Sequence, residues 1–423
     1  MAVGTGAKFV PNFLGDLVDT LTKLQSEDFW QEFFQYKTVD GNFSVYDEAD
    51  LKKFIDDKEY LPIVARLAQG ESFPLPKMTV LNKKKSDKKR RVFVFDRGEN
   101  YLLKAVAYLL NDYDRIFASN LYSFRRNVGV KNAVTDIVRK TKNRSLYSYK
   151  VDIHDYFNSV DTNIILPQLK AVLGDNEWLY GFIAELLQEP SALLGDEVVQ
   201  CQKGIMAGIP ISGFLANLYL KELDEWFAQK HAVYARYSDD IIVFAASSEL
   251  IAEYENKIKE FLRDKNLTVN EKKERYTEPN QFWEFLGFRV EENTVDLSAV
   301  ALQKMKDKMR RKARALVRWK NRTNAGDERA ISAYIRSFNI KFFDNPKRHE
   351  VTWCRWYFPT ITTVQSLRVL DEYMISCIRY IATGKHTKSN YNLRYQEIKK
   401  LGYRNLVNAY YRYKKTNLLL ELN

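Results

Sequence analysis

Apolar positions along this 423-residue chain fall into short runs typical of strands and into longer stretches with helical spacing. Strand-like runs occur at residues 78–81, 92–95 and 241–244, and a further short apolar run ends at Asp152. Helical spacing governs about residues 163–200 and most of the C-terminal third. The pattern predicts a protein that mixes helices with strands joined by tight turns.

Two adjacent carboxylates stand at the tip of a predicted β-hairpin. The chain enters this hairpin from Tyr234, passes through Tyr237-Ser238-Asp239-Asp240 and leaves along the apolar residues 241–244. Acids are poor strand residues, so two of them at this point indicate a ligand, and hard divalent cations bind through carboxylate oxygens. The alternative is an ordinary solvated hairpin turn.

A third acid, Asp152, ends the short apolar strand that begins at Tyr149 and leads into a predicted helix start. Two-metal phosphoryl transfer needs carboxylates from separate strands that hold two ions roughly 4 Å apart. An aspartate on one strand that faces an Asp-Asp hairpin meets this need. Taken alone, Asp152 is equally well placed to cap a helix.

With these acids in this order, the chain resembles the reverse transcriptase family, whose palm carries an Asp followed by paired aromatics and then a Tyr-x-Asp-Asp hairpin. The resemblance implies an α+β right-hand polymerase fold of fingers, palm and thumb, with an antiparallel palm sheet and a helical C-terminal thumb. It also implies that Asp152 and Asp239 bind two Mg²⁺ ions, with Mn²⁺ as an alternative. Asp240 and the backbone at Ile153 would complete the metal site.

The same resemblance places a nucleotide pocket after Asp152. Phe157 falls where the family has a bulky residue beneath the sugar of the incoming nucleotide, and Asp155 and Tyr156 would line the same pocket. An aromatic ring there would clash with a 2′-hydroxyl, which implies dNTP substrates. RNA-dependent RNA polymerases usually have an Asp at this position. Plain core packing is the alternative for Phe157.

A glycine-rich segment at residues 203–217 resembles the family's loop that enters a helix and lets the backbone approach the nucleotide closely. Ala207 and Gly208 are the expected nucleotide contacts. Ala207 stands where the family usually has Gln, and Gly213 where it usually has Pro. These departures put the ordinary positioning of the nucleotide in doubt.

Two later segments extend the resemblance. Lys273 falls where the family has a Lys near the leaving pyrophosphate, where it would act as general acid or electrostatic clamp. A solvated Lys at a helix end is the alternative. Leu286-Gly287, flanked by two phenylalanines, resembles the primer-grip turn, and together with Tyr237 it is expected to contact nucleic acid.

Basic residues precede the predicted palm in two places. Residues 83–91 hold seven basic residues and one acid, and they resemble the fingers hairpin that folds over the triphosphate. Lys89 and Arg91 are the expected contacts, since a guanidinium suits phosphate oxygens, while a solvated charge run is the alternative. Arg125 and Arg126 end a segment that resembles the family's Tyr-Gly-Phe-Arg motif and are expected to bind nucleic acid.

The formal net charge of +12 suits a polyanionic partner. Residues 302–322 carry ten Lys or Arg and a single acid on an amphipathic helical pattern. This pattern predicts a helix laid along a nucleic-acid backbone, with Arg311 and Arg318 among its contacts. Bases and aromatics interleave toward the C-terminus, where Lys385, Tyr403 and Arg404 are expected to contact RNA.

The order of the motifs divides the chain into an N-terminal extension and fingers (1–145), a palm (146–295) with a helical, fingers-like insertion at about 163–200, and a helical thumb and RNA-binding region (296–423). Three cysteines without a Cys-x-x-Cys pair and four histidines give no readable zinc site. The N-terminus lacks a signal-peptide pattern, and no apolar run approaches the about 20 residues needed to cross a membrane. A cytoplasmic protein of open oligomeric state is expected.

Among reverse transcriptases, the chain is most similar to the unknown-group and abortive-infection enzymes that defend bacteria against phage. The resemblance implies an RNA-directed DNA polymerase that copies a structured non-coding RNA partner into cDNA and passes through an RNA/DNA hybrid. Retron enzymes have Val-Thr-Gly after the primer grip, where this chain has Arg289-Val-Glu-Glu. Two alternatives stay open, namely a retron-type enzyme and a template-independent terminal transferase.

Overall fold

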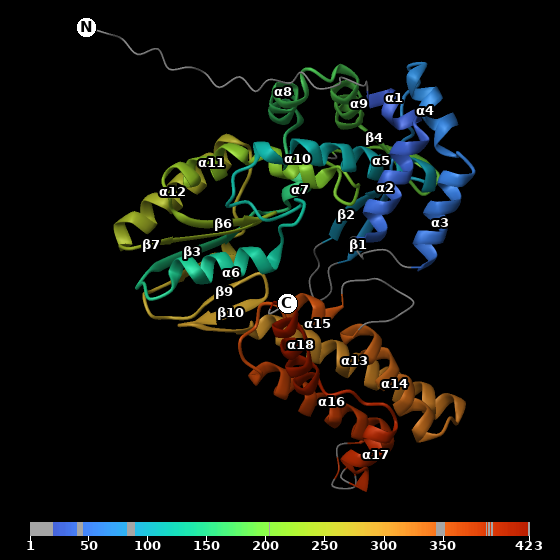
Figure 1. Cartoon of the computed structure of the whole chain (residues 1–423), viewed down its shortest axis with the longest axis vertical. Helices are drawn as coiled ribbons and strands as arrows, with labels where there is room; N and C mark the ends of the chain where they lie inside the picture. The colour runs from blue at the N-terminus through green and yellow to red at the C-terminus, as the bar shows by residue number, and fades with distance from the viewer. Residues whose placement is uncertain are drawn as a thin grey trace.

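The computed structural model describes residues 20–39, 45–82, 89–202, 204–343, 352–385, 387, 390 and 392–421. A four-stranded antiparallel sheet occupies the middle of the chain (Figure 1). Its strand order is β6-β7-β3-β8, with the bounds β3 Tyr147–Asp152, β6 Val233–Tyr237, β7 Asp240–Ala245 and β8 Arg275–Thr277. The mixture of helices with this sheet confirms the predicted α+β class and the predicted antiparallel sheet.

Both faces of this sheet are covered, which explains its continuous apolar runs. Ile241 and Val243 of β7 pack into the core with α11 and α12, whereas Ile242 and Phe244 pack into a second core with α6. Figure 1 shows α11 and α12 on one side of the sheet and α6 on the other. These helices have the bounds α6 Val130–Thr141, α10 Ser212–Tyr219, α11 Lys221–Gln229 and α12 Ser248–Asp264.

The N-terminal part is helical and ends in a hairpin that begins a second sheet. Its elements are α1 Thr20–Gln25, α2 Glu27–Val39, α3 Val45–Asp56, α4 Tyr60–Ala68, β1 Lys77–Asn82, β2 Lys89–Val94, α5 Arg97–Leu110 and the 3₁₀ helix η1 Asn111–Ile116. β1 and β2 pair antiparallel, as the two strand-like runs at 78–81 and 92–95 predict. The basic loop 83–88 between them lies outside the described residues.

The insertion predicted as helical over about 163–200 is helical only in its first part. The elements that follow β3 are α7 Tyr156–Ser159, α8 Thr162–Leu173, α9 Glu177–Gln188, β4 Ser191–Leu194 and β5 Glu197–Gln200. Helix α9 ends before Pro190, because the residue that precedes a proline is disfavoured in the helical region. The chain then forms the β4–β5 hairpin, and β4 pairs with β1 to complete the sheet β2-β1-β4-β5.

The C-terminal part consists of a small sheet followed by helices. Its elements are the 3₁₀ helix η2 Glu271–Lys273, β9 Trp283–Phe285, β10 Phe288–Glu291, β11 Thr294–Leu297, α13 Ala299–Thr323, α14 Asp327–Phe342, α15 Trp353–Tyr357, α16 Gln365–Thr383, α17 Tyr395–Lys400 and α18 Leu406–Glu421. Helix α13 begins where the Ser298 hydroxyl accepts from the Ala301 amide and ends at Asn324 in the left-handed region. No helix in the described ranges combines the length and the apolar character that a bilayer span requires.

Candidate active site

The three predicted acids meet at the end of the central sheet. Asp152, the last residue of β3, lies opposite Asp240, the first residue of β7, and Asp239 occupies the turn before it. The preceding turn residue, Ser238, has a φ of 60°. One carboxylate oxygen from each of Asp152, Asp239 and Asp240 lies within 4.8 Å of the others. Asp152 is therefore a strand residue of the acid cluster and caps no helix.

Backbone and side-chain bonds fix Asp152 in this position. The Ile153 amide donates to the Asp239 carbonyl at 3.0 Å, which ties the strand end directly to the hairpin turn. The Asn270 side-chain amide donates to one Asp152 carboxylate oxygen at 3.1 Å, and the Lys273 ammonium lies 2.5 Å from the other. The predicted residues Ile153 and Lys273 thus contact the acid cluster, and Asn270 is a further contact that was not predicted.

Burial, together with neighbouring negative charge, raises the pKa of two of these acids. Burial, followed by the neighbouring charges of Asp240 and Asp152, raises the pKa of Asp239 to about 6. Burial likewise raises the pKa of Asp240, against the opposing charge of Lys150. A divalent cation would offset this charge, and carboxylate oxygens are the donors that hard cations prefer. The donor set therefore fits Mg²⁺ or Mn²⁺, held by Asp152, Asp239 and Asp240.

We expect the Asp239→Asn variant to be more stable than the wild-type protein in metal-free solution at pH 7.5. The pKa of Asp239 in the folded protein lies above its ordinary value of 3.8. Protonation of Asp239 therefore stabilises the fold fully below about pH 4, and this stabilisation is lost as pH rises through about 6. Because asparagine carries no charge, the variant avoids this loss in the free energy of unfolding, which is on the order of 2 kcal/mol. Urea titrations in the presence of EDTA at pH 7.5 and at pH 5 measure the difference in unfolding free energy between variant and wild type. The Asp264→Asn variant, at an exposed position, is the control. An equal or lower stability of Asp239→Asn at pH 7.5 would contradict the electrostatic account.

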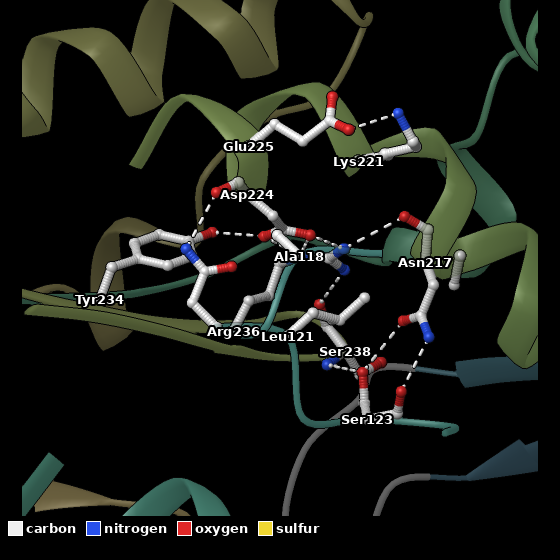
Figure 2. A network of polar contacts seen from close by, with 12 residues as sticks. Ala118, Leu121, Ser123, Asn217, Lys221, Asp224, Glu225, Tyr234, Arg236 and Ser238 are labelled. Carbon is white, nitrogen blue, oxygen red and sulfur yellow. Dashed lines mark hydrogen bonds and ion pairs between the residues drawn. The ribbon is translucent and has the colours of Figure 1, made fainter. Parts of the chain in front are cut away.

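A buried ion pair lies directly behind the hairpin turn. Arg236 and Asp224 are 0% and 1% exposed, and two guanidinium nitrogens of Arg236 donate to Asp224 at 2.5 and 2.9 Å. The Tyr234 hydroxyl donates to the same carboxylate at 2.9 Å. Figure 2 shows these side chains pointing toward one another between helix α11 and strand β6.

Hydrogen bonds connect this ion pair to the turn that carries Asp239 and Asp240. Arg236 donates to the Ser238 carbonyl at 3.3 Å, and the Ser238 amide donates to the Ser123 hydroxyl at 2.8 Å. The Asn217 side chain donates to the Ser123 carbonyl at 2.7 Å. Sequence reasoning missed this network. A lone arginine in an otherwise buried strand was the available signal, since a buried guanidinium requires a partner.

The acids stand where two clefts meet. One cleft, of about 1430 Å³, contains Asp152, Asp239 and Lys273 together with the predicted nucleotide-pocket residues Asp155, Tyr156, Phe157, Ala207 and Gly208. Tyr156 turns its hydroxyl away from the cleft and donates to the Ala216 carbonyl at 2.6 Å. Phe157 is partly exposed beside it. The structure thus brings the predicted nucleotide pocket and the acid cluster into one cavity.

The glycine-rich loop joins this cleft to the strand that carries Arg91. The Phe93 amide of β2 donates to the Ala207 carbonyl at 2.9 Å. Gly208 has a φ of 111°, and a Cβ atom there would lie 2.6 Å from Val92, so the close approach requires glycine. Arg91 lies on β2 opposite Val80. The Lys89 backbone belongs to the same strand, while its side chain lies outside the described residues.

The second cleft, of about 930 Å³, lies between the palm sheet and helix α13. Asp240 and the predicted primer-grip residues Leu286 and Gly287 line it, and Lys273 borders both clefts. Leu286 and Gly287 have φ angles of 52° and 87°, as expected for the tight turn between β9 and β10. Tyr237 ends β6 at the hairpin and is partly buried.

The other predicted nucleic-acid contacts fall into two groups. Arg311, Arg318, Lys385 and Arg404 are exposed, and the Arg126 guanidinium lies over the adjacent rings of Tyr36 and Tyr108, at 5.1 and 4.8 Å from their centroids. Two others have internal partners: Arg125 donates to the Asp114 carboxylate and to three backbone carbonyls, and the buried Tyr403 donates its hydroxyl to Asp371. Nucleic-acid binding by these last two would have to replace internal contacts, and it stays a prediction.

Comparison with known proteins gives this site a family context. Residues 82–290 match the family described as reverse transcriptase (RNA-dependent DNA polymerase). The retron Ec73 reverse transcriptase of Escherichia coli is 31% identical over 130 residues, a match that spans 29% of this chain and 39% of the relative.

Solved telomerase structures give weaker matches. The Candida albicans telomerase in complex with a fragment of telomeric RNA is 10% identical at a TM-score of 0.44, covering 82% of this chain and 68% of that one. The truncated apo telomerase of Candida tropicalis is 12% identical at a TM-score of 0.41, covering 53% and 55%.

Proposed function

We propose that this chain is an RNA-directed DNA polymerase that copies a structured non-coding RNA into cDNA, since residues 82–290 match the reverse transcriptase family and part of the chain is 31% identical to a bacterial retron reverse transcriptase. The observation that carries this proposal is the cluster of Asp152, Asp239 and Asp240, with carboxylate oxygens within 4.8 Å, at the junction of two clefts. The nucleotide would enter the first cleft, and the primer end would lie in the second.

The proposed chemistry is two-metal nucleotidyl transfer at this cluster. Two Mg²⁺ ions, when bound, supply activation of the primer 3′-hydroxyl and neutralisation of triphosphate charge. The aspartates would hold the ions, and the bond from the Ile153 amide to the Asp239 carbonyl keeps the two strands in register. Lys273 contacts Asp152 with a side chain that is 58% exposed. It is therefore free to turn toward the leaving pyrophosphate, where it donates a proton or offsets charge.

Selection of dNTPs is assigned to Phe157. Its carbonyl accepts from the Ile205 amide at 2.9 Å, and a Cβ atom on Gly204 would lie 2.2 Å from that carbonyl oxygen. The backbone of Phe157 is thus held tightly against the loop, which fixes the point from which its side chain meets the cleft. This supports a DNA product.

The RNA partner is proposed from charge and from position. Helix α13 presents exposed Arg311 and Arg318 beyond the second cleft, which suits the backbone of an RNA/DNA hybrid. Lys385 and Arg404, in the segments before and after α17, add two further exposed basic residues to the C-terminal part. The biological role that we propose, copying of a dedicated RNA in bacterial defence against phage, rests on the resemblance of the sequence.

Two other functions compete with this proposal. The identity to the retron Ec73 enzyme favours a retron-type reverse transcriptase, which shares the chemistry and differs in the RNA that is copied. A template-independent terminal transferase is favoured by Ala207, which is 1% exposed and offers the nucleotide no polar side chain.

Sequencing of bound RNA and of new DNA tests the proposal. The protein is purified from its native host, incubated with dNTPs and Mg²⁺, and both nucleic acids are sequenced. We expect one discrete RNA and DNA complementary to it. DNA unrelated to any bound RNA would overturn templated synthesis in favour of terminal transfer. DNA with part of the RNA attached covalently would favour the retron type.

A further inference from the structure

Phe124 is an aromatic residue in a backbone conformation that such residues rarely adopt. Its φ is 52°, and its side chain is 49% exposed where it lines the cleft that contains Asp152 and Asp239. A left-handed backbone costs free energy for every residue except glycine, and strained residues of this kind collect at functional sites. A half-exposed ring recovers only part of that cost through burial.

The ring of Phe124 touches the residue assigned to sugar selection. The Phe124 and Phe157 rings meet edge to face, with centroids 6.1 Å apart and an interplanar angle of 89°. Phe157 also meets Tyr156, with centroids 5.7 Å apart and an interplanar angle of 69°. Phe157 therefore contacts two rings, of which Tyr156 is buried and Phe124 is half-exposed and lines the cleft.

Gly213 makes room for this arrangement. A Cβ atom at Gly213 would lie 2.7 Å from Phe124 Cγ and 2.9 Å from both Cβ and Cδ1 of the same side chain. These contacts involve the near end of the ring, so any larger residue at 213 would displace the whole ring. The packing of Phe124 against Gly213 thus fixes where the ring stands beside Phe157.

Hydrogen bonds hold the residues on both sides of Phe124 in place. Ser123 is bound by Asn217 and by the turn residue Ser238, and Arg125 donates to Asp114. These hydrogen bonds fix the backbone conformation of the segment and hold Phe124 at its positive φ. The same segment therefore contacts the turn that carries the catalytic acids and presents the ring to the nucleotide cleft.

We propose that Phe124 is a second residue that determines sugar specificity, and that it forms with Phe157 a two-ring wall against the ribose of an incoming ribonucleoside triphosphate. This inference rests on the proposed polymerase function. The Phe157 ring would contact the ribose directly. The Phe124 ring would prevent the Phe157 ring from tilting away and would cover the side of Phe157 that faces the cleft.

Single-nucleotide addition to a DNA primer on an RNA oligonucleotide template tests the wall. The ratio of kcat/KM for dGTP to that for GTP is measured for wild type, Phe124→Ala, Phe124→Gly, Phe157→Val and the double variant Phe124→Ala/Phe157→Val. We expect each Phe124 variant to lower the ratio about tenfold and Phe157→Val to lower it up to about a hundredfold. The double variant should fall no more than about twofold below Phe157→Val, because the two rings act as one unit.

Two further variants separate specificity from stability. Phe124→Gly relieves the positive φ, so it should melt at a higher temperature than Phe124→Ala while losing the same selectivity. Gly213→Ala should lower kcat/KM for dGTP about tenfold, and Phe124→Ala placed in that background should restore it to within about threefold, because the displaced ring is gone. Tyr46→Ala, on an exposed aromatic of α3 outside the cleft lining, serves as control and should match wild type.

The outcomes are distinguishable. Wild-type selectivity in both Phe124 variants, or full additivity with Phe157→Val, would overturn the two-ring wall while leaving the polymerase function intact. Absence of rescue in the Gly213→Ala/Phe124→Ala protein would overturn the packing argument. If the wild-type protein adds neither nucleotide, the proposed function fails and the inference fails with it.

Discussion

Replacing Asp239 by asparagine should lower the rate of nucleotide addition at least about a thousandfold, because a lost metal ligand removes several kcal/mol of transition-state stabilisation. Asp239 stands between Asp152 and Asp240 in the acid cluster, and its backbone carbonyl accepts from Ile153. Asparagine keeps the size of the side chain and leaves the backbone bond in place. The expected defect is therefore chemical, and primer extension at saturating dNTP measures it.

RNA binding supplies the control for this experiment. The exposed basic residues of α13 lie on a separate element, so the dissociation constant for RNA of Asp239→Asn should stay within about threefold of wild type, since phosphate contacts dominate affinity. Asp264→Asn, an exposed aspartate at the end of α12, should retain full activity. Measurable synthesis by Asp239→Asn at more than a tenth of the wild-type rate would remove Asp239 from the metal site.

The acid cluster was predictable because its signals are local in the sequence. The Tyr237–Asp240 turn follows from an apolar strand interrupted by two acids, and Asp152 follows from a short strand that ends in one. Strand β7 is buried on two faces, so its apolar run is continuous. The register that places Asp152 opposite Asp240 was the one step that required the structure.

The contacts that hold the turn were not predictable, because they join residues far apart in the chain. Ser123 binds Asn217 and Ser238, which lie 94 and 115 residues further on. The β4–β5 hairpin escaped prediction for the same reason, since β4 joins a sheet by pairing with the distant strand β1. Hydrophobic periodicity describes one element at a time and carries no information about such partners.

Removing Asp224 should cost about 3 to 5 kcal/mol in the free energy of unfolding, because it leaves the Arg236 guanidinium buried without its partner. Arg236 is fully buried, and its bonds to Asp224 measure 2.5 to 3.1 Å. Urea denaturation of Asp224→Ala measures the loss. Lys221→Met is the matched control, because it breaks the more exposed ion pair with Glu225 on the same helix (Figure 2) and should cost less than about 1 kcal/mol.

The paired replacement Asp224→Leu/Arg236→Met separates stability from positioning. Apolar residues of similar volume in place of a buried ion pair should recover most of the stability lost in Asp224→Ala. Activity should still fall about 10- to 100-fold, because the Ser238 carbonyl loses its arginine donor and the turn that carries Asp239 is no longer fixed. A raised Mg²⁺ requirement in primer extension would locate the defect at the metal ligands. Full activity in the paired variant would show that the ion pair serves folding alone and that Ser123 suffices to hold the turn.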